Sequence, residues 1–312
     1  MKFIHGIHNL KVQHRGCVLT IGNFDGVHRG HQALLFRLCE EGRKRKLPVM
    51  VMLFEPQPME LFSPQIAPAR LTRLREKLCY LKKAGVDAVL CLRFDRRFAS
   101  HSAESFITDL LVDKLDVRFL AVGDDFRFGT GREGDFTLLQ QAGSRYGFDV
   151  ISTQTLCDNG VRISSTAIRQ ALADDKLDLA TSLLGHPFSI SGRVVYGDAL
   201  GRTIGFPTAN ILLRRSVSPV QGVYAVEVHG LGDKPLPAVA NIGSRPTVGG
   251  VRRQLEVHLF DVEMNLYGRH INVVLKEKIR DEQRFESFDA LKQQIAKDVV
   301  TARRFFGLKT PV

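Results

Sequence analysis

Short apolar runs alternate with amphipathic stretches along the first half of the chain. A short apolar run bounded by turn residues is typical of a strand buried on both faces. Between the runs, apolar residues recur at helical spacing, as at Leu74, Leu78 and Leu81, where basic residues occupy the opposite face. We expect strands at 17–21, 48–54, 87–92, 119–123 and 148–152, and helices at 32–39, 72–83, 102–111 and 135–146. This α/β order predicts a parallel sheet with helices on both faces.

The pattern changes after residue 185. A helical stretch at 172–184 ends at Gly185-His186-Pro187, which is a helix stop. Beyond it, several runs alternate apolar with polar residues, and Gly or Pro lies between them, which predicts antiparallel strands closed into a small β-barrel. The expected strands are 188–197, 222–228, 237–242, 254–261 and 271–279. A terminal helix capped by Ser287 or a nearby residue carries one apolar face, made of Phe288, Leu291, Ile295 and Val299. We therefore expect two domains, 1–185 and 186–312.

Composition and charge narrow the class of protein. The chain has 312 residues, 44% hydrophobic and 25% charged, which is ordinary for globular domains. No apolar run approaches the ~20 residues that span a bilayer, there is no signal-like segment, and the five cysteines form no C-x-x-C pair. We therefore expect a cytoplasmic protein with reduced thiols and no membrane partner.

The net charge of +11 suits either a nucleic acid or a small polyanionic substrate such as a nucleotide. The excess of Lys and Arg is spread over both parts of the chain and is not interleaved with aromatic residues as in a stacking platform. We therefore expect no nucleic-acid partner.

The stretch 22–31 reads Gly-Asn-Phe-Asp-Gly-Val-His-Arg-Gly-His and lies between the first strand and the first helix. Such a turn exposes backbone N–H groups and a helix N-terminus to an anion. His28 and His31 are three residues apart, so they share a face if the helix begins there, and two imidazoles can neutralise a reacting phosphoryl group. The alternative is a glycine turn with two surface histidines.

Other unusual residues also follow strands of the same sheet. Gln57 stands between two prolines after the second strand, the stretch 123–129 reads Gly-Asp-Asp-Phe-Arg-Phe-Gly after the fourth, and Ser164-Ser165-Thr166 opens a short helix with Arg169 after the fifth. Each alone is explained by a plain turn or a helix cap. Because the carboxyl ends of parallel strands lie at one edge, their joint placement predicts a phosphate site there.

These residues resemble the nucleotidyltransferase superfamily and, with 123–129, the N-terminal FMN adenylyltransferase domain of bacterial bifunctional riboflavin kinase/FAD synthetases. The resemblance implies a Rossmann-like domain in which the FMN phosphate attacks the α-phosphorus of ATP and pyrophosphate leaves. It implies catalytic roles for His28, His31 and Arg169, and flavin contacts from Asp125 and Phe126. The ATP-binding residues would be Gly22, Phe24, Asp25, Gly26, His28, His31, Ser164, Ser165, Thr166 and Arg169. Many members carry His where Gln57 stands.

In the second part, the stretch 201–210 reads Gly-Arg-Thr-Ile-Gly-Phe-Pro-Thr-Ala-Asn, a stiff turn able to wrap phosphates. Thr208 and Asn210 offer oxygen ligands that suit Mg²⁺, and the Gly-Lys-Ser/Thr ending of a Walker motif is absent. Glu256 and His258 share one side of a strand, and a carboxylate facing into the barrel beside this loop is a candidate general base. The alternatives are a plain barrel loop and an exposed strand glutamate.

These residues resemble the riboflavin kinase module, which is the expected partner of the first domain. The resemblance implies that Glu256 deprotonates the ribityl hydroxyl of riboflavin, that Thr208 and Asn210 hold Mg²⁺, and that Arg280 lies near the flavin. ATP would be bound by Gly201, Arg202, Gly205, Phe206, Pro207, Thr208 and Asn210. The chain would then take riboflavin, FMN and ATP and release FAD, with Mg²⁺ in both reactions.

Two other functions are compatible with the motifs taken singly. One is an adenylyl- or cytidylyltransferase for another phosphorylated substrate, which the intact second module disfavours. The other is a non-catalytic flavin-binding or nucleic-acid-binding protein, which the two phosphate loops disfavour. Substrate screening and salt-dependent binding to RNA distinguish these alternatives.

Overall fold

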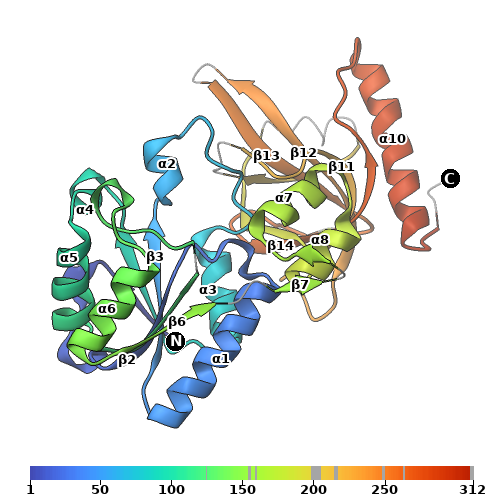
Figure 1. The fold of residues 1–312 in the computed structure, drawn as a ribbon. Helices are drawn as coiled ribbons and strands as arrows, with labels where there is room; N and C mark the ends of the chain where they lie inside the picture. The colour runs from blue at the N-terminus through green and yellow to red at the C-terminus, as the bar shows by residue number, and fades with distance from the viewer. Residues whose placement is uncertain are drawn as a thin grey trace. The chain divides into compact units, whose positions relative to one another are not determined.

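The computed structural model describes residues 1–123, 125–153, 156–158, 160–197, 205–213, 217–247, 250–262 and 264–309. The chain divides into two compact units (Figure 1). The first comprises Met1–Pro68 and Thr72–Ser164, and the second comprises Ala69–Leu71 and Ser165–Val312. The second unit thus includes two helices that the sequence pattern groups with the first domain, and the division at 185/186 stays a prediction.

The first unit is built on a six-stranded sheet in the order β1-β4-β3-β2-β5-β6, and every neighbouring pair is parallel. The strands are β1 (Lys2–His5), β2 (Cys17–Ile21), β3 (Val49–Glu55), β4 (Ala88–Arg93), β5 (Val117–Gly123) and β6 (Asp149–Thr153). The helices are α1 (Arg29–Arg45), α2 (Pro58–Phe62), α3 (Leu74–Lys83), α4 (Arg96–Ala99), α5 (Ala103–Ser105) and α6 (Phe136–Tyr146). A short hairpin of β7 (Cys157–Asp158) and β8 (Val161–Arg162) follows. The predicted α/β architecture is therefore confirmed.

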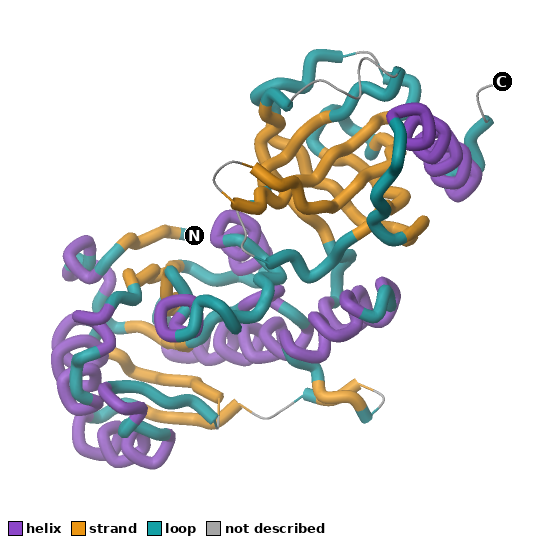
Figure 2. Tube along the Cα trace, turned by 90° about the horizontal axis from the view of Figure 1, so that it is seen from above, coloured by secondary structure: helices purple, strands orange, loops and turns teal. Residues whose placement is uncertain are grey.

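Helices cover both faces of this sheet, as Figure 2 shows from above. The alternation of side chains along a strand explains the two layers. Val18 of β2 packs with α1 and α3 through Leu35 and Leu81, whereas its neighbour Leu19 packs with the opposite layer through Leu111 and Leu139. The core therefore lies on both sides of the sheet, and β2 at its centre is buried along its whole length.

Two elements of the first unit, and the helical stretch that begins the second unit, differ from the sequence pattern. Strand β1 was not expected, because only Ile4 of its residues is buried and an edge strand of this kind has no apolar run. The helix expected at 102–111 begins as α5 and continues as a π-helix over Phe106–Lys114. The helix expected at 172–184 is two helices, α7 (Ser165–Ala173) and α8 (Leu177–Leu184), because the backbone between them turns at Asp175, where φ is 60°.

The second unit contains a closed barrel of six antiparallel strands in the order β10-β13-β12-β11-β14-β9, which confirms the predicted barrel (Figure 2). The strands are β9 (Ser189–Val195), β10 (Ala209–Leu212), β11 (Gly222–His229), β12 (Leu236–Thr247), β13 (Gly250–Leu259) and β14 (His270–Arg280). The sequence pattern missed β10, which is only four residues long.

Helix α10 (Phe288–Phe305) covers part of the outside of the barrel. Ser287 caps it as predicted, since its hydroxyl accepts the Ala290 N–H at 3.1 Å. Val299 and Ala302 pack on the barrel, whereas Phe288 of the predicted apolar face is 50% exposed. No helix within the described residues is long and apolar enough to cross a membrane.

Candidate functional site

Strand β2 is the point at which the chain changes direction across the sheet. The chain runs from β2 to β3 on one side and returns later to β5 on the other. Residues 22–31 follow β2, Gln57 follows β3, and residues 123–129 follow β5, so the three segments leave the same edge of adjacent strands. Ligands of open α/β sheets bind at such a switch point, and the structure therefore confirms that these motifs meet at one edge.

The two histidines of the motif form a stacked pair. His28 is the N-cap of α1, and its Nδ1 accepts the His31 backbone N–H at 3.4 Å. The two imidazole rings lie 3.7 Å apart between centroids, with 20° between their planes. The ring of the buried Phe24 lies 4.7 Å from the His31 ring between centroids. Phe24 thus supports the pair, and both imidazoles lie at a helix N-terminus, where anions bind.

The environment of His31 keeps its imidazole neutral. Its pKa lies well below the ordinary 6.5, first because it is buried and then because His28 and Lys77 add positive charge nearby. Lys77 of α3 is only 1% exposed. The sequence pattern placed the basic residues of this helix on its exposed face, so the burial of Lys77 corrects that expectation. Its position three residues after Leu74 was the signal that could have marked it.

A buried polar cluster fixes the turn between β2 and α1. The Asp25 carboxylate accepts the Thr72 backbone N–H at 2.9 Å and its hydroxyl at 3.2 Å, and the Gly26 N–H donates to the same hydroxyl at 2.9 Å. All three groups are buried, so each bond replaces water that would otherwise solvate a polar atom. Asp25 and Gly26 therefore shape the phosphate turn, and Thr72 is a partner that the sequence did not reveal.

Two buried side-chain atoms in the described part of the chain make no hydrogen bond, and both belong to residues already singled out. They are Nδ1 of His31 and Nε2 of Gln57. Gln57 is 6% exposed, and its own backbone N–H is bound by Glu60 at 2.9 Å. Because almost every buried polar atom in a folded protein has a partner, these two atoms indicate a ligand that supplies one.

The segment after β5 carries the two residues for which flavin contacts were predicted. A Cβ on Gly123 would lie 2.8 Å from Oδ1 of Asp125, so this carboxylate lies close to the end of β5. The half-buried Phe126 ring stacks on Phe128 with 5.6 Å between centroids. These are the two residues for which flavin contacts were predicted, and both lie on the loop beside the histidine turn.

The Ser164–Arg169 segment starts beside α1. A Cβ on Gly30 would lie 3.6 Å from the carbonyl oxygen of Ile163, which places Ser164 next to the first turn of that helix. Ser165 and Thr166 begin α7 in the second unit, where Nε of Arg169 donates to the carbonyl of Ala69 at 2.6 Å. The joint action of these residues with the histidines stays a prediction.

Three polar residues of the barrel lie in one row, and Asn210 and Glu256 are two of the predicted site residues. Asn210 pairs with Glu256, and Glu256 pairs with Asn241, so their side chains share a face. Leu255 and Val257, which are 0% exposed, alternate with Glu256 and fill the barrel interior. The expectation that Glu256 faces into the barrel is therefore wrong, because a fully apolar interior leaves the carboxylate on the outer face.

Hydrogen bonds order this row and the phosphate loop beside it. Gln254 donates to the Glu256 carboxylate at 2.6 Å, and Nδ2 of Asn210 donates to the Thr208 carbonyl at 3.4 Å. Nδ1 of His258 bonds the Pro207 carbonyl at 2.9 Å, and the burial of His258 lowers its pKa, so the imidazole is neutral and Nδ1 carries the proton. His258 thereby holds the segment that leads into β10, which includes Gly205, where φ is 88°. Gly201 and Arg202 lie outside the described residues.

Arg280 connects the barrel to α10. Its guanidinium donates to both carboxylate oxygens of Asp298 at 2.7 to 3.1 Å and lies 5.7 Å from the Phe285 ring. Gly243 of β12 lies against the Glu282 carboxylate, and a Cβ there would collide with it. Arg280 pairs with Val223, which pairs with Asn241, so this arginine lies on the same outer face as Glu256.

A nucleotidyltransferase-like α/β unit and a phosphate-binding barrel thus share one chain, and known proteins combine the same two parts. A family model described as FAD synthetase matches residues 10–167, and one described as riboflavin kinase matches residues 184–306. The chain belongs to the bifunctional riboflavin kinase/FMN adenylyltransferase family.

Individual relatives agree with this assignment along the whole chain. The Escherichia coli (strain K12) bifunctional riboflavin kinase/FMN adenylyltransferase is 75% identical over 312 residues and 100% of both chains. The Haemophilus influenzae protein of the same name is 53% identical over 98% of this chain and 100% of that one. A crystal structure of a macrolide-efflux protein from Streptococcus pneumoniae has a TM-score of 0.79 at 31% identity, covering 97% and 99% of the two chains. The resemblance seen in the motifs is therefore confirmed.

Proposed function

We propose that the chain makes FAD from riboflavin in two steps, each catalysed at its own site. In the first, the ribityl hydroxyl of riboflavin attacks the γ-phosphorus of ATP and gives FMN and ADP. In the second, the FMN phosphate attacks the α-phosphorus of another ATP and gives FAD and pyrophosphate. The observation that carries this proposal is that one chain holds two separate groups of predicted site residues, the stacked His28–His31 pair and the Asn210–Glu256 row.

The adenylyl transfer requires charge stabilisation and no covalent intermediate. Negative charge grows on the phosphate oxygens as the pyrophosphate leaves, and donors aimed at that charge lower the barrier. His28 and His31 would supply donors at the N-terminus of α1, and Gln57 would supply a neutral amide donor through its unpartnered Nε2. Ser164, Ser165, Thr166 and Arg169 would orient the phosphates of ATP, and Asp125 and Phe126 would contact the flavin.

The phosphoryl transfer requires a base for the hydroxyl of riboflavin. Glu256 is the carboxylate of the barrel row, and the hydrogen bond from Gln254 fixes the orientation of its side chain. We assign the general-base role to Glu256, with Phe206, Pro207, Thr208 and Asn210 around the ATP phosphates and Arg280 positioning the flavin side of the site.

Mg²⁺ fits the oxygen donors of this row. The described residues contain no group of three or more His, Cys, Asp or Glu side chains able to hold a metal by themselves. Mg²⁺ commonly keeps waters and substrate phosphates among its ligands, so Thr208 and Asn210 are sufficient protein donors. When bound, the ion would neutralise phosphate charge. A cytoplasmic location fits the five cysteines, all of which are free thiols.

The direct experiment is to incubate the pure protein with riboflavin, ATP and MgCl₂ and to separate the flavins by chromatography. FMN should appear first and FAD should follow, and an excess of EDTA should stop both. The appearance of neither flavin nucleotide would refute the proposal.

A further inference from the structure

A second concave site lies at the opposite edge of the parallel sheet, where the strands begin. A cavity of about 630 Å³ opens where β1, β3 and β4 start and α1 ends. Pockets of this volume hold small organic ligands. Parallel strands place their amino ends away from their carboxyl ends, so this cavity is distinct from the site that contains His28 and His31.

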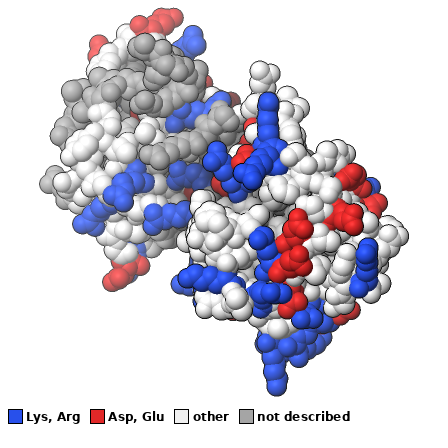
Figure 3. Space-filling view, turned by 90° about the vertical axis from the view of Figure 1, so that its left-hand side faces the viewer, with Lys and Arg blue, Asp and Glu red and all other residues white. Residues whose placement is uncertain are grey.

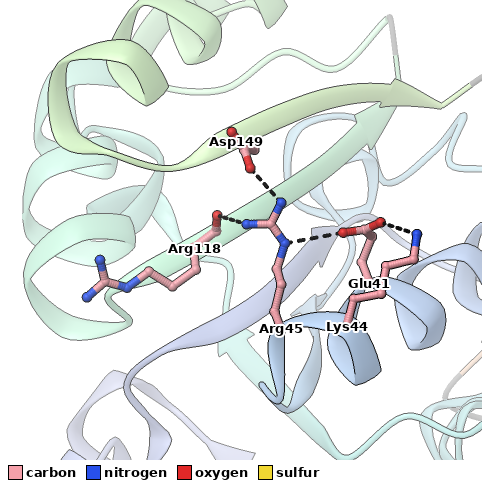
Figure 4. A network of polar contacts seen from close by, with 5 residues as sticks. All are labelled: Glu41, Lys44, Arg45, Arg118 and Asp149. Atoms are coloured by element: carbon pink, nitrogen blue, oxygen red, sulfur yellow. Dashed lines mark hydrogen bonds and ion pairs between the residues drawn. The ribbon is translucent and has the colours of Figure 1, made fainter.

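Cationic side chains line this cavity. They are Lys2, Arg43 and Lys46, and none of them forms an ion pair within the described ranges of the chain. The adjacent basic residues at the end of α1 behave differently, because Lys44 pairs with Glu41, and Arg45 pairs with Glu41 and Asp149 (Figure 4). Figure 3 shows Lys and Arg side chains gathered at its lower edge, the level at which α1 ends in Figure 1.

The remaining lining is apolar apart from a few polar groups. Leu47, Pro48 and Met50 contribute carbon surface. The one carboxylate of the lining belongs to Asp87 and accepts the Val49 backbone N–H at 2.9 Å. The cavity therefore combines an apolar wall with an excess of positive charge, which suits an anion that carries an apolar body.

His14 reports the electrostatic character of this cavity. It is buried in the lining, and its Nδ1 accepts the Lys11 N–H at 3.0 Å. Its pKa is lowered first by burial and then by the charges of Lys2 and Lys11. The charges of Lys2 and Lys11 thus reach the cavity wall, and positive charge there attracts an anion.

We propose that this cavity binds an organic phosphate of about nucleotide size, with the phosphate among Lys2, Arg43 and Lys46 and the apolar body against Leu47, Pro48 and Met50. The concave shape favours a small molecule over an acidic protein surface, and the carbon lining favours an organic phosphate over the inorganic ion. The proposal does not depend on either reaction of the enzyme.

The thiol of Cys39 provides a local test because it lines the cavity and is partly exposed, whereas Cys79 is exposed elsewhere. The probe is AMP, which neither proposed reaction consumes or releases. Alkylation of each thiol of the full chain by N-ethylmaleimide is followed by mass spectrometry. At an AMP concentration ten times its dissociation constant, Cys39 should react roughly tenfold more slowly, and Cys79 should react at an unchanged rate.

Matched variants exclude protection from elsewhere. The triple variant Lys2→Gln/Arg43→Gln/Lys46→Gln should lose the protection. The triple variant Arg37→Gln/Lys82→Gln/Lys114→Gln should keep it, because it removes the same charge from residues that do not line the cavity. His28→Ala should also keep it, which separates this site from the ATP site on the same unit. Thermal unfolding verifies that each variant is folded.

Three results would overturn the proposal. They are an unchanged Cys39 rate with AMP, protection that survives in the cavity triple variant, and protection that disappears in His28→Ala. Protection by poly-glutamate without protection by AMP would also overturn it, in favour of an acidic protein partner.

Discussion

The imidazole rings of His28 and His31 lie face to face, 3.7 Å apart between centroids. Two imidazolium ions at this distance would repel each other strongly, so charging one ring disfavours charging the other. Burial and the nearby charges of His28 and Lys77 keep the pKa of His31 well below 6.5. The imidazole of His31 is therefore neutral in the free site.

A titration of the ring protons by NMR tests this relationship. In the free protein, His31 should titrate well below pH 6.5, because burial and two positive neighbours disfavour its charged form. In His28→Ala, the midpoint should rise, since one of these neighbours is gone while the burial remains. A His31 midpoint at or above 6.5 in the free protein would contradict the account.

The same shift makes the free energy of unfolding depend on pH. Between the folded pKa of His31 and its unfolded value of 6.5, the unfolded chain binds a proton that the folded chain does not. The first unit should therefore lose stability as the pH falls from about 7.5 to 5.5. His31→Gln should flatten this decline in urea unfolding, whereas the same change at the exposed His5 should not. A decline of equal slope in His31→Gln would exclude His31 as its cause.

Thr72 should matter through the turn that it holds. In Thr72→Val, the buried Gly26 N–H loses its acceptor, which costs about 1–3 kcal/mol of stability. FAD formation from supplied FMN should slow while FMN formation stays at the native rate, because Asp25 and Gly26 shape only the first site. Thr72→Ser keeps the hydroxyl and should restore both properties. Equal loss in the serine variant would show that the methyl group, and not the hydroxyl, is important.

Gln57 should show opposite effects on stability and activity. Its Nε2 is buried without a partner, so Gln57→Met removes an unsatisfied donor and should leave the unfolding free energy unchanged or raise it by about 1 kcal/mol. FAD formation should nevertheless fall, since the amide donor toward the phosphates is lost. Calorimetry and the adenylylation rate measure the two effects. A loss of stability without a loss of rate would make Gln57 structural.

His258 should act on the kinase loop alone. Its hydrogen bond to the Pro207 carbonyl fixes the loop around ATP, so His258→Leu should raise the KM for ATP in FMN formation. Adenylylation of supplied FMN should be unaffected. His229→Leu is the matched control, because His229 is the last residue of β11, at the other end of that strand from Val223, which pairs with Asn241, and it pairs only with Glu227 among the ion pairs described. An equal rise in both variants would contradict the role of His258.

Much of this arrangement follows from local sequence. Consecutive apolar residues define the buried strands β2 to β5, and the Gly-rich turn after β2 predicts the phosphate edge because parallel strands end together. Strand β1 escaped prediction because an edge strand buries one residue in four here and leaves no apolar run.

Long-range packing accounts for the remaining differences. The pairing of Asp25 with Thr72 joins residues that local pattern does not relate, and the burial of Lys77 depends on the turn that packs on α3. The face of Glu256 depends on which side of β13 becomes the apolar interior, and period-two alternation alone fixes only that Glu256 and His258 share a side.

The central claim is that the chain carries two independent active sites. The measurement that tests it most directly compares Glu256→Ala and His28→Ala in two assays, FMN formation from riboflavin and FAD formation from supplied FMN. Glu256→Ala should lower the first rate by about 10²–10⁴ and leave the second unchanged, because it removes the general base of the barrel alone. His28→Ala should lower only the second, by about 10²–10³. If either variant, still folded, loses both activities, the division into two sites is wrong.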